Sequence, residues 1–323
     1  MSAKTGIEWC DSTWNCIRGC SRVSAGCTHC YAESIAARFS GPGQAYEGLA
    51  KMTPSGPRWT GKVELVPDRL EDPRHWKKPR RVFVNSMSDL FHESLPVGDI
   101  MRVFGVMSLA PQHQFQILTK RPQRMLLILN GKGADRWCRD SAAATANNSS
   151  LQISWPLKNV WLGVSIEDQA TADERIPLLL QTPAAVRFVS YEPALGPVDF
   201  TEWLRDGFPE GEQLLDPHFM RHGTPRLDQI ITGGESGPGA RPSNPNWHRS
   251  VRDQCQEAGV PYFFKQWGEW APLDVAGSEA SGGWAPIKTP DRLAQFDEEI
   301  MFRIGKKAAG RLLDGREWSE FPK

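Results

Sequence analysis

The cysteines are the residues of this chain whose type and spacing could do chemistry. Five of the seven lie within the first 30 residues, while Cys138 and Cys255 stand alone. We find no secretory signal, so we expect a cytoplasmic protein whose thiols stay reduced. In that compartment, crowded cysteines favour a metal or cluster site over a disulfide framework. The crowded residues are Cys10, Cys16, Cys20, Cys27 and Cys30.

Three of these cysteines, Cys20, Cys27 and Cys30, lie in the glycine-containing segment GCSRVSAGCTHCYAE. Glycine permits tight curvature, and the N-terminus of a helix predicted to begin at Tyr31 favours negative charge such as a thiolate. The segment is therefore suited to a soft metal centre. We expect the helix to bury a stripe made of Ala32, Ile35, Ala36 and Phe39.

Three interpretations of the cysteines remain open. Structural zinc usually takes four ligands, and the fourth could come from His29, Cys16 or Cys10. A four-iron cluster held by only three thiolates would leave one iron open to a substrate or cofactor. In the third interpretation, the thiols are simply buried and free.

Short β-rich runs alternate with helical patterns along most of the chain, as is typical of parallel βα units. Continuous apolar runs suit strands that are buried on both faces. We also expect helices near 100–107, 125–129 and 247–258, the last ending at Gly259. The predicted strands are 81–85, 114–118, 160–164, 186–190, 227–231 and 261–264, with 7–9 as an additional first strand.

Polar segments containing Gly, Pro or Ser follow five of these strands, and α/β proteins bind ligands at such strand ends. A barrel would bring all five ends to one mouth, so the pattern favours a full or partial (β/α) barrel over an open sheet. The predicted fold class is therefore α/β. The segments are NSMSD at 85–89, TKRP at 119–122, SIED at 165–168, SYEP at 190–193 and GGESG at 233–237.

The composition is that of a globular protein with a sizeable core. The chain has 323 residues, of which 40% are hydrophobic and 24% charged. No apolar run approaches the roughly 20 residues that a membrane helix requires, so we expect no membrane partner. Lys plus Arg and Asp plus Glu both number 38, so the net charge favours no charged partner. We predict a barrel domain at 1–268 with a flexible insertion at 131–157, and a C-terminal extension at 269–323 packed on the barrel.

Two local basic clusters could bind nucleic acid. Basic side chains around a Trp can follow a phosphate backbone while the ring stacks on a base. A solvated face is the alternative explanation of such runs. The first cluster surrounds Trp76 and contains Arg74, Lys77, Lys78, Arg80 and Arg81, and the second contains Lys306, Lys307, Arg311 and Arg316.

Taken together, the motifs resemble a known family. Over nearly its whole length the chain is similar to the three-cysteine-motif proteins of phages and bacteria, which are regarded as relatives of the radical S-adenosylmethionine (SAM) enzymes. That family usually has Pro at the position of Cys16, which argues against Cys16 as an essential ligand. The resemblance rests on TGIEWCDSTWN, GCSRVSAGCTHCYAE, VFVNSMSDLFH, ILTKRP, VWLGVSIEDQ, RFVSYEPALGPVD, IITGGESGPGARP, VPYFFKQWGEW and KKAAGRLLDGREW.

The resemblance implies a [4Fe-4S] cluster bound by Cys20, Cys27 and Cys30, with SAM on the open iron and an electron donor as a partner. The chain departs from the usual radical SAM motif, because six residues rather than three separate its first two cysteines. Two residues separate the second and third cysteines, as in that motif.

The same resemblance suggests that strand-end residues bind SAM. Cations such as Lys120 and Arg121 could hold its carboxylate or a substrate phosphate, or could instead pair with neighbouring carboxylates. Each acidic candidate could equally be a helix cap or a partner in a loop salt bridge. The candidates are Ser86, Ser88, Asp89, Lys120, Ser165, Glu167, Glu192, Gly233, Gly234 and Glu235.

Two functions follow from these observations. The first is a radical SAM-like iron–sulfur enzyme that reductively cleaves SAM to act on an unidentified substrate, with nucleic acid as one option. The second is a nucleic-acid-binding or repair-associated protein in which zinc or an iron–sulfur centre only staples the N-terminal region. Polar ligand-type residues at five strand ends favour the enzyme.

Overall fold

The computed structural model describes residues 5–205, 225–279 and 293–323. The chain divides into two compact units, and the division does not coincide with the predicted boundary between 268 and 269. The first unit contains 1–164 and 177–187, and the second contains 165–176 and 188–323. Within the described residues, no helix is both long enough and apolar enough to span a bilayer.

The first unit contains parallel strands in the order β1, β6, β7 and β8. Strands β6 (Arg81–Val84), β7 (Gln114–Thr119) and β8 (Val160–Ile166) confirm the predicted strands, and all but the first residue of β6 and two residues of β7 are buried. The strand predicted at 7–9 is wrong, because a turn closes there and the amide of Cys10 donates to the carbonyl of Ile7. The edge strand β1 is Ser12–Trp14 instead.

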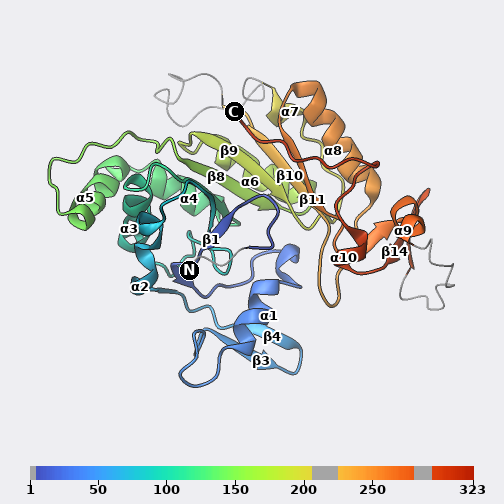
Figure 1. The fold of residues 1–323 in the computed structure, drawn as a ribbon, viewed down its shortest axis with the longest axis horizontal. Helices are drawn as coiled ribbons and strands as arrows, with labels where there is room; N and C mark the ends of the chain where they lie inside the picture. Colours follow the sequence, from blue (N-terminus) through green and yellow to red (C-terminus); the bar gives the residue numbers. More distant parts are fainter. Residues whose placement is uncertain (1–4, 206–224, 280–292) are drawn as a thin grey trace. The chain divides into compact units, whose positions relative to one another are not determined.

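Helices α3 (Val97–Ser108) and α4 (Pro122–Leu129) lie where helical spacing predicted them. The segment 131–157, predicted to be a flexible insertion, contains helix α5 (Ala134–Ala146). Helix α5 packs along α3 (Figure 1). A Cβ at Gly105 of α3 would come 2.9 Å from the amide nitrogen of Ala142, so only glycine permits this approach.

The cysteine segment leads into helix α1 (Tyr31–Arg38). Two small antiparallel sheets of two strands each belong to the same part of the chain. One pair is β2 (Ile17–Arg18) with β5 (Glu64–Leu65), and the other is the hairpin β3 (Ala50–Thr53) with β4 (Gly56–Trp59). Helix α1 packs on this hairpin (Figure 1). Helix α2 (Pro67–Leu70) follows β5.

The predicted buried stripe of α1 is wrong in two of its four members. Ala32 and Ala36 are buried, and Ala36 packs with Ala37 and Ala50 of the hairpin. Ile35 and Phe39 are exposed by 37% and 51%. The physical reason is that α1 turns its small alanines and Glu33 toward the hairpin, where Glu33 accepts from the amide of Trp59.

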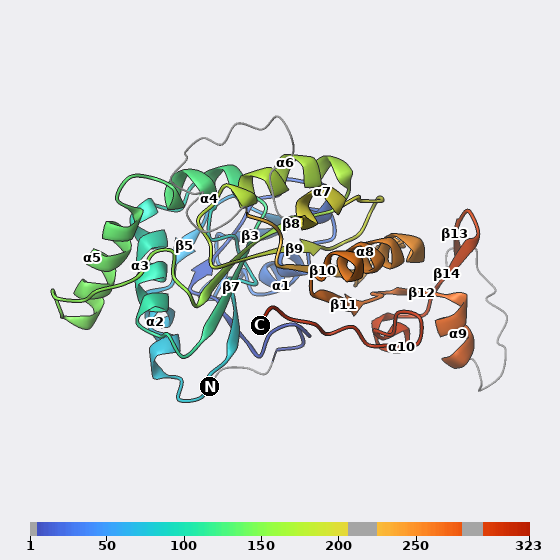
Figure 2. The ribbon, with the colours of Figure 1, turned by 90° about the horizontal axis from the view of Figure 1, so that it is seen from above.

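The second unit contains the parallel strands β9 (Val186–Tyr191), β10 (Gln229–Gly233) and β11 (Tyr262–Gln266), of which β9 begins in the first unit. Helix α8 (Pro245–Ala258) lies beside β10 and β11 (Figure 2). It buries Val251 and Cys255 and ends at Gly259 with φ 64°, as the sequence predicts. Helices α6 (Gln169–Leu180) and α7 (Thr201–Leu204) precede β9 and β10.

The C-terminal part departs from the βα rhythm, as expected after Trp267. Strand β12 (Trp270–Pro272) pairs antiparallel with β14 (Glu299–Arg303), which also pairs with β13 (Leu293–Phe296). Helices α9 (Leu273–Glu279) and α10 (Lys306–Ala309) complete this part.

The main sheet has the strand order β1-β6-β7-β8-β9-β10-β11. From β6 to β11, each strand lies beside the strand that precedes it in the chain, and β1 and β11 stand at the two ends of the order. The fold is therefore α/β with a seven-stranded sheet, which agrees with a partial rather than a closed barrel.

Candidate functional site

The three cysteines of the segment lie together on the loop between β2 and α1, and all three are half-buried. The pKa of the Cys20 thiol is raised to about 12, mainly by burial and also by the nearby Asp89 and Cys30, while Arg121 opposes the rise. Burial also raises the pKa of Cys30, and the neighbouring Cys27 adds to this effect. Each thiol is thus close enough to another for ionisation of one to oppose ionisation of the next.

Helix α1 begins immediately after Cys30 and stabilises charge on its sulfur. The backbone amides of Ala32 and Glu33 donate to this thiol and thereby oppose the rise of its pKa. Amide donors and a nearby Arg favour the thiolate, the form in which cysteine binds metal, but burial outweighs them and the pKa of both thiols is raised.

The donor set fits a thiolate-bound centre in its chemistry. In the described ranges, no three or more His, Cys, Asp or Glu side chains are already arranged as ligands around a metal position. Among the other cysteines of the N-terminal region, Cys16 is fully buried and its thiol donates to Asn85 Oδ1 at 3.7 Å. Cys10 is also buried, with its sulfur 3.8 Å from the carbonyl oxygen of Ile7. Both therefore occupy packed positions, in contrast to the three loop cysteines.

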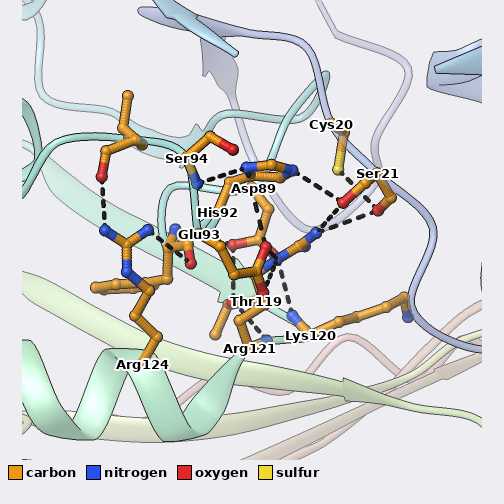
Figure 3. Close-up of polar contacts among 12 residues, drawn as sticks. Cys20, Ser21, Asp89, His92, Glu93, Ser94, Thr119, Lys120, Arg121 and Arg124 are labelled. Atoms are coloured by element: carbon orange, nitrogen blue, oxygen red, sulfur yellow. Dashed lines mark hydrogen bonds and ion pairs between the residues drawn. The ribbon is translucent and has the colours of Figure 1, made fainter. Parts of the chain in front are cut away.

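Asp89, which follows β6, forms hydrogen bonds through its side chain with residues at the carboxyl end of β7 (Figure 3). Its carboxylate accepts from Thr119 Oγ1 at 2.7 Å, from the amide of Lys120 at 3.1 Å and from Arg121 Nη1 at 3.0 Å. The amide of Phe91 donates a fourth bond at 2.9 Å. The buried carboxylate is therefore satisfied by the chain itself, and the alternative interpretation of Arg121, pairing with a strand-end carboxylate, is the one observed.

Arg121 connects this carboxylate to the residue that follows Cys20. Its guanidinium pairs with both Asp89 and Glu93, and its Nη2 donates to the Ser21 hydroxyl at 2.8 Å and the Ser21 carbonyl at 3.2 Å. The Arg121 side chain is only 4% exposed. A buried cation thus stands between the ends of two central strands and the cysteine loop (Figure 3).

His92 provides a second contact to Ser21. Its Nδ1 accepts from the amide of Ser94 at 3.2 Å, so the neutral ring carries its proton on Nε2, which lies 2.9 Å from the Ser21 hydroxyl oxygen. Burial, and then the charge of Arg121, lower the pKa of His92 and keep the ring neutral. Neither Ser21 nor His92 is among the residues predicted from the sequence, and the local signal for His92 is its position three residues after Asp89.

Ser86 and Ser88 support the cysteine loop from the end of β6. The Ser86 hydroxyl donates to Asn15 Oδ1 at 3.2 Å, and the Ser88 hydroxyl donates to the carbonyl of Ile17 at 3.0 Å. The Tyr31 hydroxyl donates to the Ser86 carbonyl at 2.6 Å. Ser86 and Ser88 thus bond to residues just before the cysteine segment, and Asp89, which also accepts from the Lys120 amide, is connected to Ser21 through Arg121. Their contact with SAM stays a prediction.

In the second unit, Glu167 follows β8 and is completely buried. Arg175 Nη1 of α6 lies 3.2 Å from its carboxylate and donates to the Ser165 carbonyl at 2.7 Å. One arginine thus binds both predicted residues, Ser165 and Glu167. Glu167 is therefore a partner in a salt bridge, which is the alternative to ligand binding for this residue.

Glu192 follows β9 and pairs with Lys265 of β11 at 3.0 Å. The Ser190 hydroxyl donates to the same carboxylate at 2.9 Å. A Cβ at Gly233 would come 2.6 Å from Glu192 Oε1, and one at Gly234 would come 2.0 Å from the carbonyl oxygen of Trp267. Close contacts within the chain therefore explain both glycines, and SAM binding at them stays a prediction.

Glu235 is buried and belongs to another internal ion pair. The Arg241 guanidinium donates to its two oxygens at 2.9 and 2.6 Å, and the Arg241 amide donates at 2.8 Å.

The basic segment around Trp76 is largely engaged with its own surroundings. Arg74 pairs with Glu71, and Arg81 pairs with Asp11 at 3.7 Å. Arg80 stacks over the Trp76 ring at 4.8 Å. Lys77 and Lys78 are exposed. Binding of nucleic acid by this segment stays a prediction.

With this geometry in view, comparison with known proteins places the chain in a family. It belongs to the family described as "Protein of unknown function (DUF5131)", which matches residues 4–322. No curated protein and no solved structure matches the chain.

Proposed function

We propose that this protein is a radical SAM-like enzyme whose Cys20, Cys27 and Cys30 bind a [4Fe-4S] cluster. Three thiols on one loop leave one iron free, which suits a SAM amino acid moiety. Such a cluster supplies the single electron that cleaves the sulfonium bond of SAM. The unidentified substrate would then react in the same site.

The observation that carries the proposal is the placement of three half-buried thiols on one loop, beside the buried Arg121 and the first turn of helix α1. Ionisation of Cys20 is coupled to that of Cys30, and the buried guanidinium of Arg121 favours the thiolate of Cys20. The amides at the start of α1 favour the thiolate of Cys30. Free structural cysteines do not need a buried cation and a helix N-terminus beside them.

The residues around the loop position it. Arg121 and His92 both bind the Ser21 hydroxyl, which fixes the backbone next to Cys20. Ser86 and Ser88 hold the strand that leads into the loop. The hydroxyls of Ser86 and Ser88 already donate their hydrogens to the chain. A bound SAM would therefore use these hydroxyl oxygens as hydrogen-bond acceptors.

The test is anaerobic reconstitution of the full chain, followed by iron, sulfide and zinc analysis and an assay of SAM cleavage. We expect about four iron and four sulfide ions per chain. Cys20→Ala, Cys27→Ala and Cys30→Ala should each abolish the cluster. Cys138→Ala and Cys255→Ala are the matched controls, because both thiols are fully buried on helices α5 and α8.

Each outcome has a definite meaning. Stoichiometric zinc without iron would contradict the proposal and favour the metal-stapled nucleic-acid-binding protein. A cluster whose electron paramagnetic resonance signal does not change on adding SAM would show an iron–sulfur protein without SAM chemistry.

A further inference from the structure

The β3–β4 hairpin holds two basic side chains directly opposite each other. Lys51 of β3 and Arg58 of β4 are register partners in the antiparallel pair, so their side chains leave the same face of the hairpin. Like charges at such positions repel and destabilise a hairpin. Among the described residues neither forms an ion pair, and Arg58 Nη1 donates to the Pro57 carbonyl at 2.7 Å. The pair is therefore unfavourable in the free chain, and an anion bound to it would relieve the repulsion.

The segment around this hairpin is more basic than the rest of the chain. From Arg18 to Glu64 it contains six basic and three acidic residues, whereas the whole protein has no net charge. One of the acids, Glu33, is buried and is compensated by its ion pair with Arg22. Five cations of the segment form no ion pair with any residue that the structure describes: Arg18, Arg38, Lys51, Arg58 and Lys62.

Two aromatic rings lie beside these cations. Tyr46 and Trp59 are half-buried, with one side packed on the alanines of α1 and with their ring centroids 6.4 Å apart. The Arg18 guanidinium lies over the Tyr46 ring at 5.6 Å. Neither the Tyr46 hydroxyl nor Trp59 Nε1 has a hydrogen-bond partner in the described part of the chain. The rings thus keep both an open surface and unused polar atoms.

We propose that these groups form a binding surface for single-stranded nucleic acid. Cations without carboxylate partners bind phosphates, and partly exposed rings stack on unpaired bases. The inference does not rest on the proposed function, because the surface contains none of the loop cysteines. We define the hairpin surface as Arg18, Tyr46, Lys51, Arg58, Trp59 and Lys62.

The arrangement along β4 favours a single strand over other polyanions. Arg58 and Trp59 are consecutive and therefore point to opposite faces of the hairpin. A strand that crosses this edge can place a phosphate on Arg58 and a base on Trp59. An acidic protein would use the cations but would leave the rings unoccupied, and a duplex keeps its bases stacked on each other. Both are outcomes of the test.

The experiment measures fluorescence anisotropy of labelled single-stranded DNA and RNA of mixed sequence, titrated with the full chain at several salt concentrations. It is done before and after reconstitution with iron and sulfide. The test variants are Lys51→Glu, Lys51→Glu/Arg58→Glu and Tyr46→Leu. The matched control, Lys132→Glu/Lys158→Glu, reverses the same number of charges at exposed positions elsewhere in the first unit.

We expect the double variant to lower the slope of log affinity against log salt by roughly 1.4, since each phosphate contact to a single strand contributes about 0.7. Tyr46→Leu should weaken binding by about fivefold or more with an unchanged slope, because stacking is not ionic. Lys51→Glu should weaken binding while leaving the thermal midpoint unchanged or raised, because it replaces a like-charge pair with an opposite one. A purely structural role of Lys51 would not separate the two effects in this way.

Three results would overturn the inference. They are wild type that binds neither single-stranded DNA nor RNA at low salt, a double variant that binds like wild type, and a control that loses as much affinity as the double variant. Tighter binding of duplex DNA or of polyglutamate than of single strands would also overturn it, in favour of those partners. A chain that binds single strands but takes up no iron would defeat the proposed function and support the hairpin surface.

Discussion

Both compact units have buried carboxylates that follow parallel strands. The arginines that pair with these carboxylates make different further contacts in the two units. In the first unit, Arg121 pairs with Asp89 and also binds Ser21 next to Cys20. In the second unit, Arg175 pairs with Glu167 and Glu174 and donates to the nearby Ser165 carbonyl. Both arginines are almost completely buried.

Under the proposed function, the first network acts on the cluster ligands and the second acts only on the fold. A buried ion pair gives little net stability by itself, because desolvation of both charges offsets their attraction. A pair whose cation also faces ionisable thiols can shift their ionisation, whereas a cation whose contacts are carboxylates and a backbone carbonyl has no such effect. The first unit therefore contains the candidate site, and the ion pairs of the second unit hold strand ends in place.

The largest expected effect comes from removing each arginine. Arg121→Gln and Arg175→Gln should each lower the free energy of unfolding by roughly 3–5 kcal/mol, because each leaves a buried carboxylate unpaired. Only Arg121→Gln should also reduce the iron content after reconstitution. Urea denaturation and iron analysis of both variants test this. Equal iron loss in both would mean that the two networks do not differ in function.

The sequence predicted the sheet better than it predicted the site. Continuous apolar runs located six strands, since burial on both faces leaves that pattern in the residues themselves. The first strand was misplaced because Ile7 and Trp9 are apolar yet lie in a turn, where Trp9 packs on Phe83. The orientation of α1 was also wrong, because periodicity shows that Ile35 and Phe39 share a face with each other but not that this face is buried.

The site residues also divide into those that the sequence predicts and those that it does not. The cysteines and Asp89 stand in short motifs that can be read locally. Ser21 and Arg121 are 100 residues apart, and their hydrogen bond depends on the pairing of β1, β6 and β7. No local pattern encodes such a contact, and none shows whether a strand-end carboxylate will be satisfied by the chain or left for a ligand.

The second-largest effect on stability is expected at two glycines, one in each unit, that allow two backbone segments to approach each other closely. A Cβ at Gly19 would come 2.1 Å from the carbonyl oxygen of Lys62, and Gly19 has φ 87°. A Cβ at Gly234 would come 2.0 Å from the carbonyl of Trp267. Gly19→Ala and Gly234→Ala should each cost roughly 1–3 kcal/mol of stability. Gly19→Ala should also lower iron uptake because it displaces Cys20, and normal uptake would contradict that link. Gly98→Ala, where a Cβ meets nothing, is the control.

The third effect is a pH dependence that arises in the second unit. Burial lowers the pKa of His248 from 6.5 to about 3. Below pH 6.5 the unfolded chain therefore binds a proton that the folded chain does not, and the free energy of unfolding falls as the pH drops toward 3. The expected loss is roughly 1.4 kcal/mol per pH unit. Urea denaturation at pH 7 and pH 5 should show a smaller pH effect for His248→Gln, whereas the exposed His75→Gln should behave as wild type.

The smallest effect on stability is expected for charges that neither network uses. Lys77 and Lys78 are exposed, whereas Arg74 and Arg81 of the same segment form ion pairs. Replacing both lysines with Ala should change the free energy of unfolding by less than about 0.5 kcal/mol and should leave the iron content unchanged.

If both lysines contact phosphates, the slope of log affinity for nucleic acid against log salt should fall by roughly 1.4 to 1.8, since each contact releases condensed counterions. Anisotropy titrations at several salt concentrations measure that slope, and an unchanged slope would make the segment a solvated face.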